Sequence, residues 1–192
     1  MQTVPLSPRA QAMIARLDAA VDQCANHDAS CQAVKKVLEA WIHPRADFLG
    51  PEFLLPKPDS YARRLLYRHP EGAYSVAIMV WGVGQGTPIH DHAGLWCVEC
   101  VYRGCIRVDS YDLQGTPDDE EVGFKPAGSV TAGCGSAGAL IPPFDYHVIE
   151  NAGDEPAITV HVYGGDMDWC HAYVPVDGGR YRRDRKTLCF TA

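Results

Sequence analysis

The sequence predicts an all-β fold, a barrel preceded by two helices, within one domain of 192 residues. From Ala73 onward, short β-branched and aromatic runs are separated by Gly, Pro, Asp and Asn at intervals typical of a sandwich or barrel. Before them, residues 8–24 and 31–42 carry apolar side chains at helical spacing, with Ser7 as a candidate N-cap. We therefore expect a helical cap over residues 1–58 and a β-barrel of about ten strands over 59–192.

Composition narrows the classes of function. The formal charge of -7 argues against nucleic acid and weakly against an anionic membrane surface, because both attract Lys and Arg. We find no secretory leader and no apolar run near the ~18 residues of a membrane span. The eight cysteines are best interpreted as free thiols in a reducing compartment. The sequence thus predicts a cytoplasmic protein with a small-molecule partner, and a monomer is the default expectation.

Three histidines form the candidate metal site. His90 and His92 are two residues apart, so on a strand both side chains would point to the same face. His147, on a later predicted strand, can complete a facial triad. Imidazole suits iron, copper, nickel and zinc, so the spacing does not choose the metal. Glu99 is an alternative carboxylate ligand. It is better interpreted as an ordinary strand residue or as a partner of the ligands that does not itself bind the metal.

These histidines lie in a longer pattern, Gly84-x5-His90-x-His92-x4-Cys97-x6-Gly104 followed by Pro142-x-Phe144-x2-His147-x3-Asn151. The pattern resembles the two signature motifs of the cupin superfamily, which implies a cupin (double-stranded β-helix, or jelly-roll) barrel and a bound metal. Cys97 stands where a cupin carboxylate is usual, and Phe144 stands where a glycine is usual. Three neutral imidazoles would leave the metal with its full charge, which favours anionic ligands such as a thiolate.

Longer stretches resemble the cysteine dioxygenase family, a family of thiol dioxygenases. SYARRLL and VWGVGQGTPIHDHAGLWC are similar to its carboxylate-binding and metal-binding stretches, and EPAITVHVYGGDMDWCHAY is similar to its outer-sphere stretch. The similarity runs from Tyr61 to Phe190. It implies one Fe(2+) per chain, held by His90, His92 and His147. It also implies that O2 oxidises the thiol of a small mercapto-acid to a sulfinic acid.

The resemblance also implies a substrate-binding group. Arg63 falls where the cysteine-oxidising members have the arginine that holds the substrate carboxylate, and Tyr61 is its aromatic neighbour. Chemically, a guanidinium can hold a carboxylate through two hydrogen bonds. Arg64 lies beside Arg63 and is an alternative for the same task. The plainer interpretation is that Arg63 is a surface arginine and that Tyr61 packs in the core.

Catalytic candidates follow from the same resemblance. Thr159, His161 and Tyr163 alternate along a predicted strand and therefore share a face. They resemble a Ser-His-Tyr hydrogen-bond chain of the family, with Thr in place of Ser, and Tyr163 would donate to developing negative charge. Cys97 and Tyr163 match the positions that a thioether joins in animal members. We therefore expect a partial cross-link, with an inert buried thiol as the alternative.

The substrate is left open by the sequence. Arg63 favours L-cysteine, mercaptosuccinate is a rival whose second carboxylate would need Arg64 or Arg68, and 3-mercaptopropionate is third. Two other classes also remain: a zinc cupin hydrolase or isomerase, and a non-catalytic cupin sensor. The sequence assigns no role to Cys100, Cys105, Cys134 or Cys170.

Overall fold

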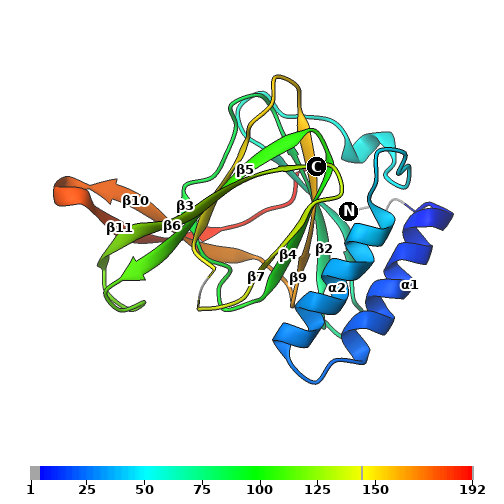
Figure 1. Cartoon of the computed structure of the whole chain (residues 1–192), viewed down its shortest axis with the longest axis horizontal. Coiled ribbons are helices and arrows are strands. Elements are labelled where there is room, and N and C mark those ends of the chain that lie inside the picture. Colours follow the sequence, from blue (N-terminus) through cyan, green and yellow to red (C-terminus); the bar gives the residue numbers. More distant parts are fainter. Residues whose placement is uncertain (1–4, 144, 192) are drawn as a thin grey trace.

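A computed structural model describes residues 5–143 and 145–191, so the motif position Phe144 lies outside the described part. Two β-sheets face each other, and two helices cover the outer face of one of them (Figure 1). The first sheet has the order β1-β2-β9-β4-β7, with the bounds Ala62–Arg68, Ser75–Trp81, Ala157–Tyr163, Cys97–Arg103 and Ala137–Leu140. This architecture confirms the predicted all-β cupin fold with N-terminal helices.

The second sheet closes on itself as a barrel in the order β10-β11-β6-β5-β8-β3. Its bounds are Trp169–Val176, Arg180–Thr187, Glu121–Gly133, Cys105–Gln114, His147–Asn151 and Ile89–His90. Short 3-10 turns, η1 (Pro51–Phe53) and η2 (Asp177–Gly179), lie before β1 and between β10 and β11. Since β3 and β8 pair directly, sequence segments far apart in the chain meet in the barrel wall.

Both helices begin at a side-chain cap. Ser7 accepts the N–H of the residue three positions on at 3.1 Å, and α1 runs over Pro8–Asp22. Asn26 does the same at 2.9 Å for α2, His27–Trp41. An N-cap satisfies N–H groups that have no partner inside the helix. The predicted start of the second helix at residue 31 was wrong because Asn26 already caps the preceding turn.

The helices are held to the first sheet by one apolar cluster. Met13, Leu17 and Leu38 are fully buried against a sheet face that includes Val76 and Ile78. Full burial of each such side chain contributes about 1.5–3 kcal/mol relative to exposure. The helical layer therefore fixes one face of the sheet, and the opposite face of the same strands lines the interior.

Two of the eleven strands in the described part were not predicted as strands. In β1, Arg63 and Arg64 interrupt any apolar alternation, but the strand pairs with β2 along its length. In β6, glycines and Pro126 hide the pattern, and most of its side chains are exposed. A bulge opposite Ser110–Tyr111 lets Pro126 sit in the β5–β6 ladder. Both β1 and β6 therefore form because they pair with neighbouring strands, and not because their own residues favour a strand.

Three broader predictions concern the chain as a whole. No helix in the described residues is long and apolar enough to cross a membrane. The eight cysteines are free thiols in the structure. The helices α1 and α2 precede residue 58 and all strands follow it, while the assignment of residues 1–192 to a single domain stays a prediction.

Candidate metal centre and its pocket

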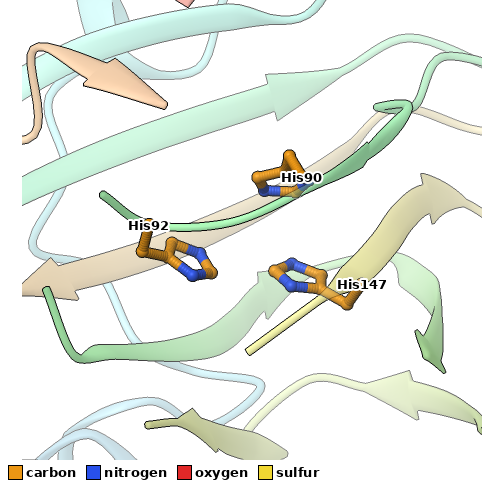
Figure 2. A group of neighbouring side chains, drawn as sticks. All are labelled: His90, His92 and His147. Carbon is orange, nitrogen blue, oxygen red and sulfur yellow. The ribbon is translucent and has the colours of Figure 1, made fainter. Parts of the chain in front are cut away.

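The three candidate ligands converge on one point of the barrel interior (Figure 2). His90 ends β3, His147 begins β8, and their Cα atoms are paired in the ladder between these strands. Their ring centroids are 4.4 Å apart, and the ring of His92 lies 5.1 Å from that of His147. The expectation that His90 and His92 share one strand was wrong, because β3 ends at His90. His92 reaches the site from the following turn.

That turn is braced by Asp91. Its Oδ1 accepts the backbone N–H of Ala93 at 3.1 Å, and Ala93 has a φ of 53°. A non-glycine residue in this left-handed region is uncommon and strained. Asp91 also accepts the backbone N–H of His171 at 2.9 Å and pairs with its Nδ1 at 2.8 Å. The turn that carries His92 is therefore fixed to β10.

The hydrogen bonds of the three rings determine which nitrogen each offers. His90 Nδ1 lies 3.2 Å from the carbonyl of Pro88, and His147 Nδ1 lies 3.1 Å from the carbonyl of Asp145. His92 Nδ1 lies 3.0 Å from Oδ2 of Asp145. Carbonyl and carboxylate oxygens only accept, so each Nδ1 carries the proton. Every Nε2 then keeps its lone pair, and the ligand atoms lie within 4.8 Å of one another.

The rings of His90 and His147 are also uncharged at neutral pH. Burial, followed by the repulsion of the neighbouring imidazoles, lowers the pKa of His147 well below its usual value. The same causes lower the pKa of His90 to about 4. Metal ligation requires neutral imidazole, so the site is prepared for a cation without releasing protons. Three inward nitrogen donors fit a divalent transition metal, and by themselves they fit iron, copper, nickel and zinc alike.

A narrow cavity opens over the histidines, with ≈ 30 Å³ of space for water-sized molecules. Tyr61, Trp81, Tyr163 and Lys186 are among the residues that line it. Its volume restricts the site to a small ligand. The cavity thus joins the metal centre to three predicted site residues, Tyr61, His161 and Tyr163.

Arg63 does not itself line this cavity, but it contacts Met167 and Tyr163, which do. The residue is 3% exposed, and its Nη2 donates to the carbonyl of Met167 at 2.6 Å. Its Nε and Nη1 are buried and have no hydrogen-bond partner in the described residues. The guanidinium lies 4.3 Å from the ring centroid of Phe190 and 5.8 Å from that of Tyr163. Two unpaired, buried N–H groups leave a place for an anionic acceptor.

The other two candidate arginines, Arg64 and Arg68, do not line the cavity either and lie further from it. Arg63 pairs in register with Met79, which lines the cavity, whereas Arg64 pairs with Ile78, part of the cluster under the helices. Arg64 is therefore on the opposite face of β1. Arg68 is about half exposed and donates to Asp166 at 2.6 Å. Neither residue lies where the prediction of a second carboxylate-binding arginine requires it.

The expected hydrogen-bond chain on β9 is half formed. Thr159 and His161 are joined by an Oγ1–Nε2 hydrogen bond of 2.7 Å, and Trp81 Nε1 donates to the same hydroxyl at 2.9 Å. His161 and Tyr163 instead stack, with ring centroids 6.0 Å apart. The hydroxyl of Thr159 therefore links Trp81 to His161.

Glu99 lies between the metal centre and His161. It is 5% exposed, its Oε2 is 4.0 Å from His147 Nε2 and 3.7 Å from His161 Nδ1, and this oxygen has no hydrogen-bond partner in the described part. Burial raises its pKa to about 7. The compact cluster of possible ligands contains the three histidines alone. Glu99 therefore lies outside that cluster, in an outer position.

Cys97 and Tyr163 face each other across neighbouring strands. Their Cα atoms are paired in the β4–β9 ladder, and both side chains belong to one buried cluster. Burial raises the pKa of each group well above its usual value, so both are protonated at neutral pH. Cys170 belongs to the same cluster and also lines the cavity. The geometry brings together the two residues of the expected cross-link.

Comparison with known proteins decides the family. The sequence model of the family described as Cysteine dioxygenase type I matches residues 1–175. The chain belongs to this family. It is therefore a dioxygenase-type oxidoreductase that acts on thiols, with a three-histidine metal site.

Its relatives include animal enzymes. Cysteine dioxygenase type 1 of Rattus norvegicus is 27% identical over 174 residues, which is 90% of this chain and 82% of that protein. The Homo sapiens protein of the same name is 25% identical over 175 residues, again 90% and 82%. Among solved structures, the Schizosaccharomyces pombe Cnp3 cupin domain aligns with a TM-score of 0.41 and 14% identity, covering 55% of this chain and 61% of that one.

Sequence reasoning missed three residues of this dioxygenase site. Asp145 stands two residues before His147, and only the hydrogen-bond requirement of His92 could have pointed to a buried carboxylate. Lys186 lies in β11, a basic segment in which nothing in the sequence singles out one lysine. His171 follows Cys170 directly, but its pairing with Asp91 depends on the β3–β10 contact. All three depend on long-range pairing of strands.

The buried titratable groups make the stability of the metal-free protein depend on pH. Three buried histidines stay neutral in the folded protein: the pKa is lowered to about 4 for His90, to about 3 for His161 and well below its usual value for His147. In the unfolded chain the same side chains gain protons near pH 6.5. Acidification from pH 7 to 5 therefore favours the unfolded state. Glu99, with its pKa raised to about 7, opposes this trend. The three histidines destabilise the fold on acidification and Glu99 alone stabilises it, so we expect the free energy of unfolding to fall between pH 7 and 5.

Urea unfolding of the chelated protein at a series of pH values measures this dependence. Glu99→Gln removes the opposing contribution, so its unfolding free energy should fall more steeply than that of the wild type between pH 7 and 5. A wild-type stability that stays level or rises on acidification would contradict the neutral, buried state of these histidines.

Proposed function

We propose that the chain is an iron(II) dioxygenase that uses O2 to oxidise L-cysteine to its sulfinic acid in the cytoplasm. His90, His92 and His147 would hold the metal. The observation that carries the choice of substrate is Arg63, whose buried Nε and Nη1 have no partner among the described residues and which contacts the cavity-lining Met167 and Tyr163. A single carboxylate offers the acceptors that these two N–H groups need.

When bound, iron(II) supplies the redox chemistry and a position where thiolate and dioxygen can meet. The protein's residues position the reactants and stabilise charge. Arg63 binds the carboxylate, and its positive charge in a dry pocket favours the thiolate form of the substrate. Tyr163 keeps its proton because burial raises its pKa, so its hydroxyl can donate to negative charge that develops on the reacting oxygens.

Behind Tyr163, the fixed pair Thr159–His161 limits how its ring can move. His161 stacks on Tyr163 at an interplanar angle of 21°, and the bond to Thr159 holds the imidazole in that orientation. We infer that His161 and Thr159 act as positioning residues for Tyr163 and do not relay a proton to it.

Oxygen uptake tests the proposal directly. Protein loaded anaerobically with Fe(2+) should consume one O2 per cysteine and release the sulfinate, with slower turnover of mercaptosuccinate and 3-mercaptopropionate. Mass spectrometry identifies the product, and metal analysis of the protein as purified gives the resident ion. Zinc as the only bound metal, with no oxygen uptake after iron loading, would favour a cupin hydrolase or isomerase. Absence of any bound metal would favour a sensor.

Arg63 and Arg64 form a matched pair for testing the carboxylate site. Arg63→Ala should raise KM for cysteine roughly 10- to 100-fold, because charge-assisted hydrogen bonds contribute about 1.5–3 kcal/mol. Arg63→Lys should recover part of the loss, since an ammonium keeps the positive charge but cannot donate the two parallel hydrogen bonds of a guanidinium. Arg64→Ala lies on the other face of β1 and should change KM little. An equal effect of both alanine variants would contradict the assignment of Arg63.

Lys186 supports one alternative substrate. It lines the cavity, and its ammonium is the second cation that mercaptosuccinate would need in place of Arg64 or Arg68. Faster turnover of mercaptosuccinate than of cysteine, lost in Lys186→Met, would establish this alternative. The neighbouring Arg185, whose guanidinium lies 4.2 Å from the ring of Trp169, provides the control variant Arg185→Met.

We also propose that Cys97 and Tyr163 become partly joined by a thioether during turnover. A bond would form between Sγ and a ring carbon, with loss of the thiol and ring hydrogens to dioxygen as oxidant. Intact mass should then fall by two hydrogens, and a cross-linked peptide should appear after digestion. Cys97→Ser should show neither change. A wild-type mass that stays constant through many turnovers would rule out the cross-link.

A further inference from the structure

We propose that Asp145 is the positioning residue of the metal centre, holding two of its three histidines through the ring nitrogens that face away from the metal. This inference rests on the proposed function only in taking His90, His92 and His147 as the metal ligands. It concerns the metal-binding step and is independent of the substrate.

The side chain of Asp145 holds His92 at two atoms. Asp145 is 3% exposed, and its Oδ2 accepts the backbone N–H of His92 at 3.0 Å and the Nδ1–H of the same residue at 3.0 Å. Two donors from one residue on one oxygen fix both the chain and the ring. His92 needs this support because it follows the end of β3 and lies in no strand. His90 and His147 are held by the strand ladder.

The main chain of Asp145 holds the second ligand. Its carbonyl accepts from His147 Nδ1 at 3.1 Å, so the same residue sets the tautomer of both rings. The rings of His92 and His147 are nearly parallel, at 14°, and each offers one nitrogen to the cluster of ligand atoms. Only His90 is oriented by another residue, Pro88. A displacement of Asp145 would therefore misalign two donors together.

The charge of Asp145 gives this position a chemical consequence. Three neutral imidazoles leave a divalent ion uncompensated, whereas many non-haem iron sites have a carboxylate among the ligands. A carboxylate hydrogen-bonded to the far nitrogen of a ligating imidazole makes that imidazole a stronger donor. Asp145 thus acts through His92 on the metal. Glu99 differs, because its nearer oxygen makes no hydrogen bond to a ligand within the described residues.

Two variants separate the geometry from the charge. Asp145→Asn keeps an oxygen that can accept both N–H groups of His92 but removes the charge, and Asp145→Ala removes both. We expect the affinity for Co(2+), used as a spectroscopic probe, and for Fe(2+) under anaerobic conditions to fall about 10- to 100-fold in the asparagine variant. The alanine variant should bind still more weakly. Chelator competition measures both affinities.

The spectrum of bound Co(2+) distinguishes this role from a general effect on folding. A weaker His92 donor should shift the ligand-field bands of the Asp145→Asn protein at saturating metal, which a purely structural role would leave in place. Asp18→Asn is the matched control, because Asp18 is a partly buried carboxylate in α1 that accepts from Tyr74 at 2.7 Å. It should bind metal like the wild type.

The outcomes are separable from those of the proposed function. Wild-type affinity and unshifted bands in Asp145→Asn would overturn the inference, even if the alanine variant fails to fold. Wild-type protein that binds Co(2+) but shows no iron-dependent oxygen uptake would overturn the proposed function, while the cobalt measurements would still decide the role of Asp145.

Discussion

The metal centre depends on three hydrogen bonds that are made away from the metal. In His90, His92 and His147, Nδ1 donates to an oxygen of the protein, which leaves Nε2 as the free donor on every ring. An imidazole can rotate and can exchange its proton between nitrogens, so three converging side chains alone would not make a site. The acceptors at Pro88 and Asp145 remove that freedom before a cation binds.

Around this centre, the structure separates charge by distance from the metal. The nearest groups are the three imidazoles, and the buried carboxylates Asp145 and Glu99 lie further out. Arg63 lies near Tyr163, and two of its N–H groups have no partner among the described residues. Such an arrangement leaves the metal itself able to attract a thiolate while the surroundings remain electrically balanced. It also explains how an acidic chain with a net charge of -7 can keep a local site for an anionic substrate.

The sequence predicted the parts of this site that short-range patterns control. The helices, most strands and the three histidines follow from periodicity and from motif spacing, because apolar alternation and HxH placement are local properties. The errors are equally specific. His92 was predicted on a strand, but β3 ends at His90. Arg64 was considered beside Arg63, but the side-chain alternation of β1 turns it toward the helices.

What the sequence could not provide is the set of contacts made across the barrel. Asp145 reaches His92 over 53 positions in the chain, and Asp91 reaches His171 over 80. No local pattern encodes such pairs, since they depend on how β3 lies between β8 and β10. Barrel closure thus contributes to the chemistry as well as to stability. It brings a carboxylate to the one ligand that no strand holds, and this makes the short β3 sufficient to carry a metal site.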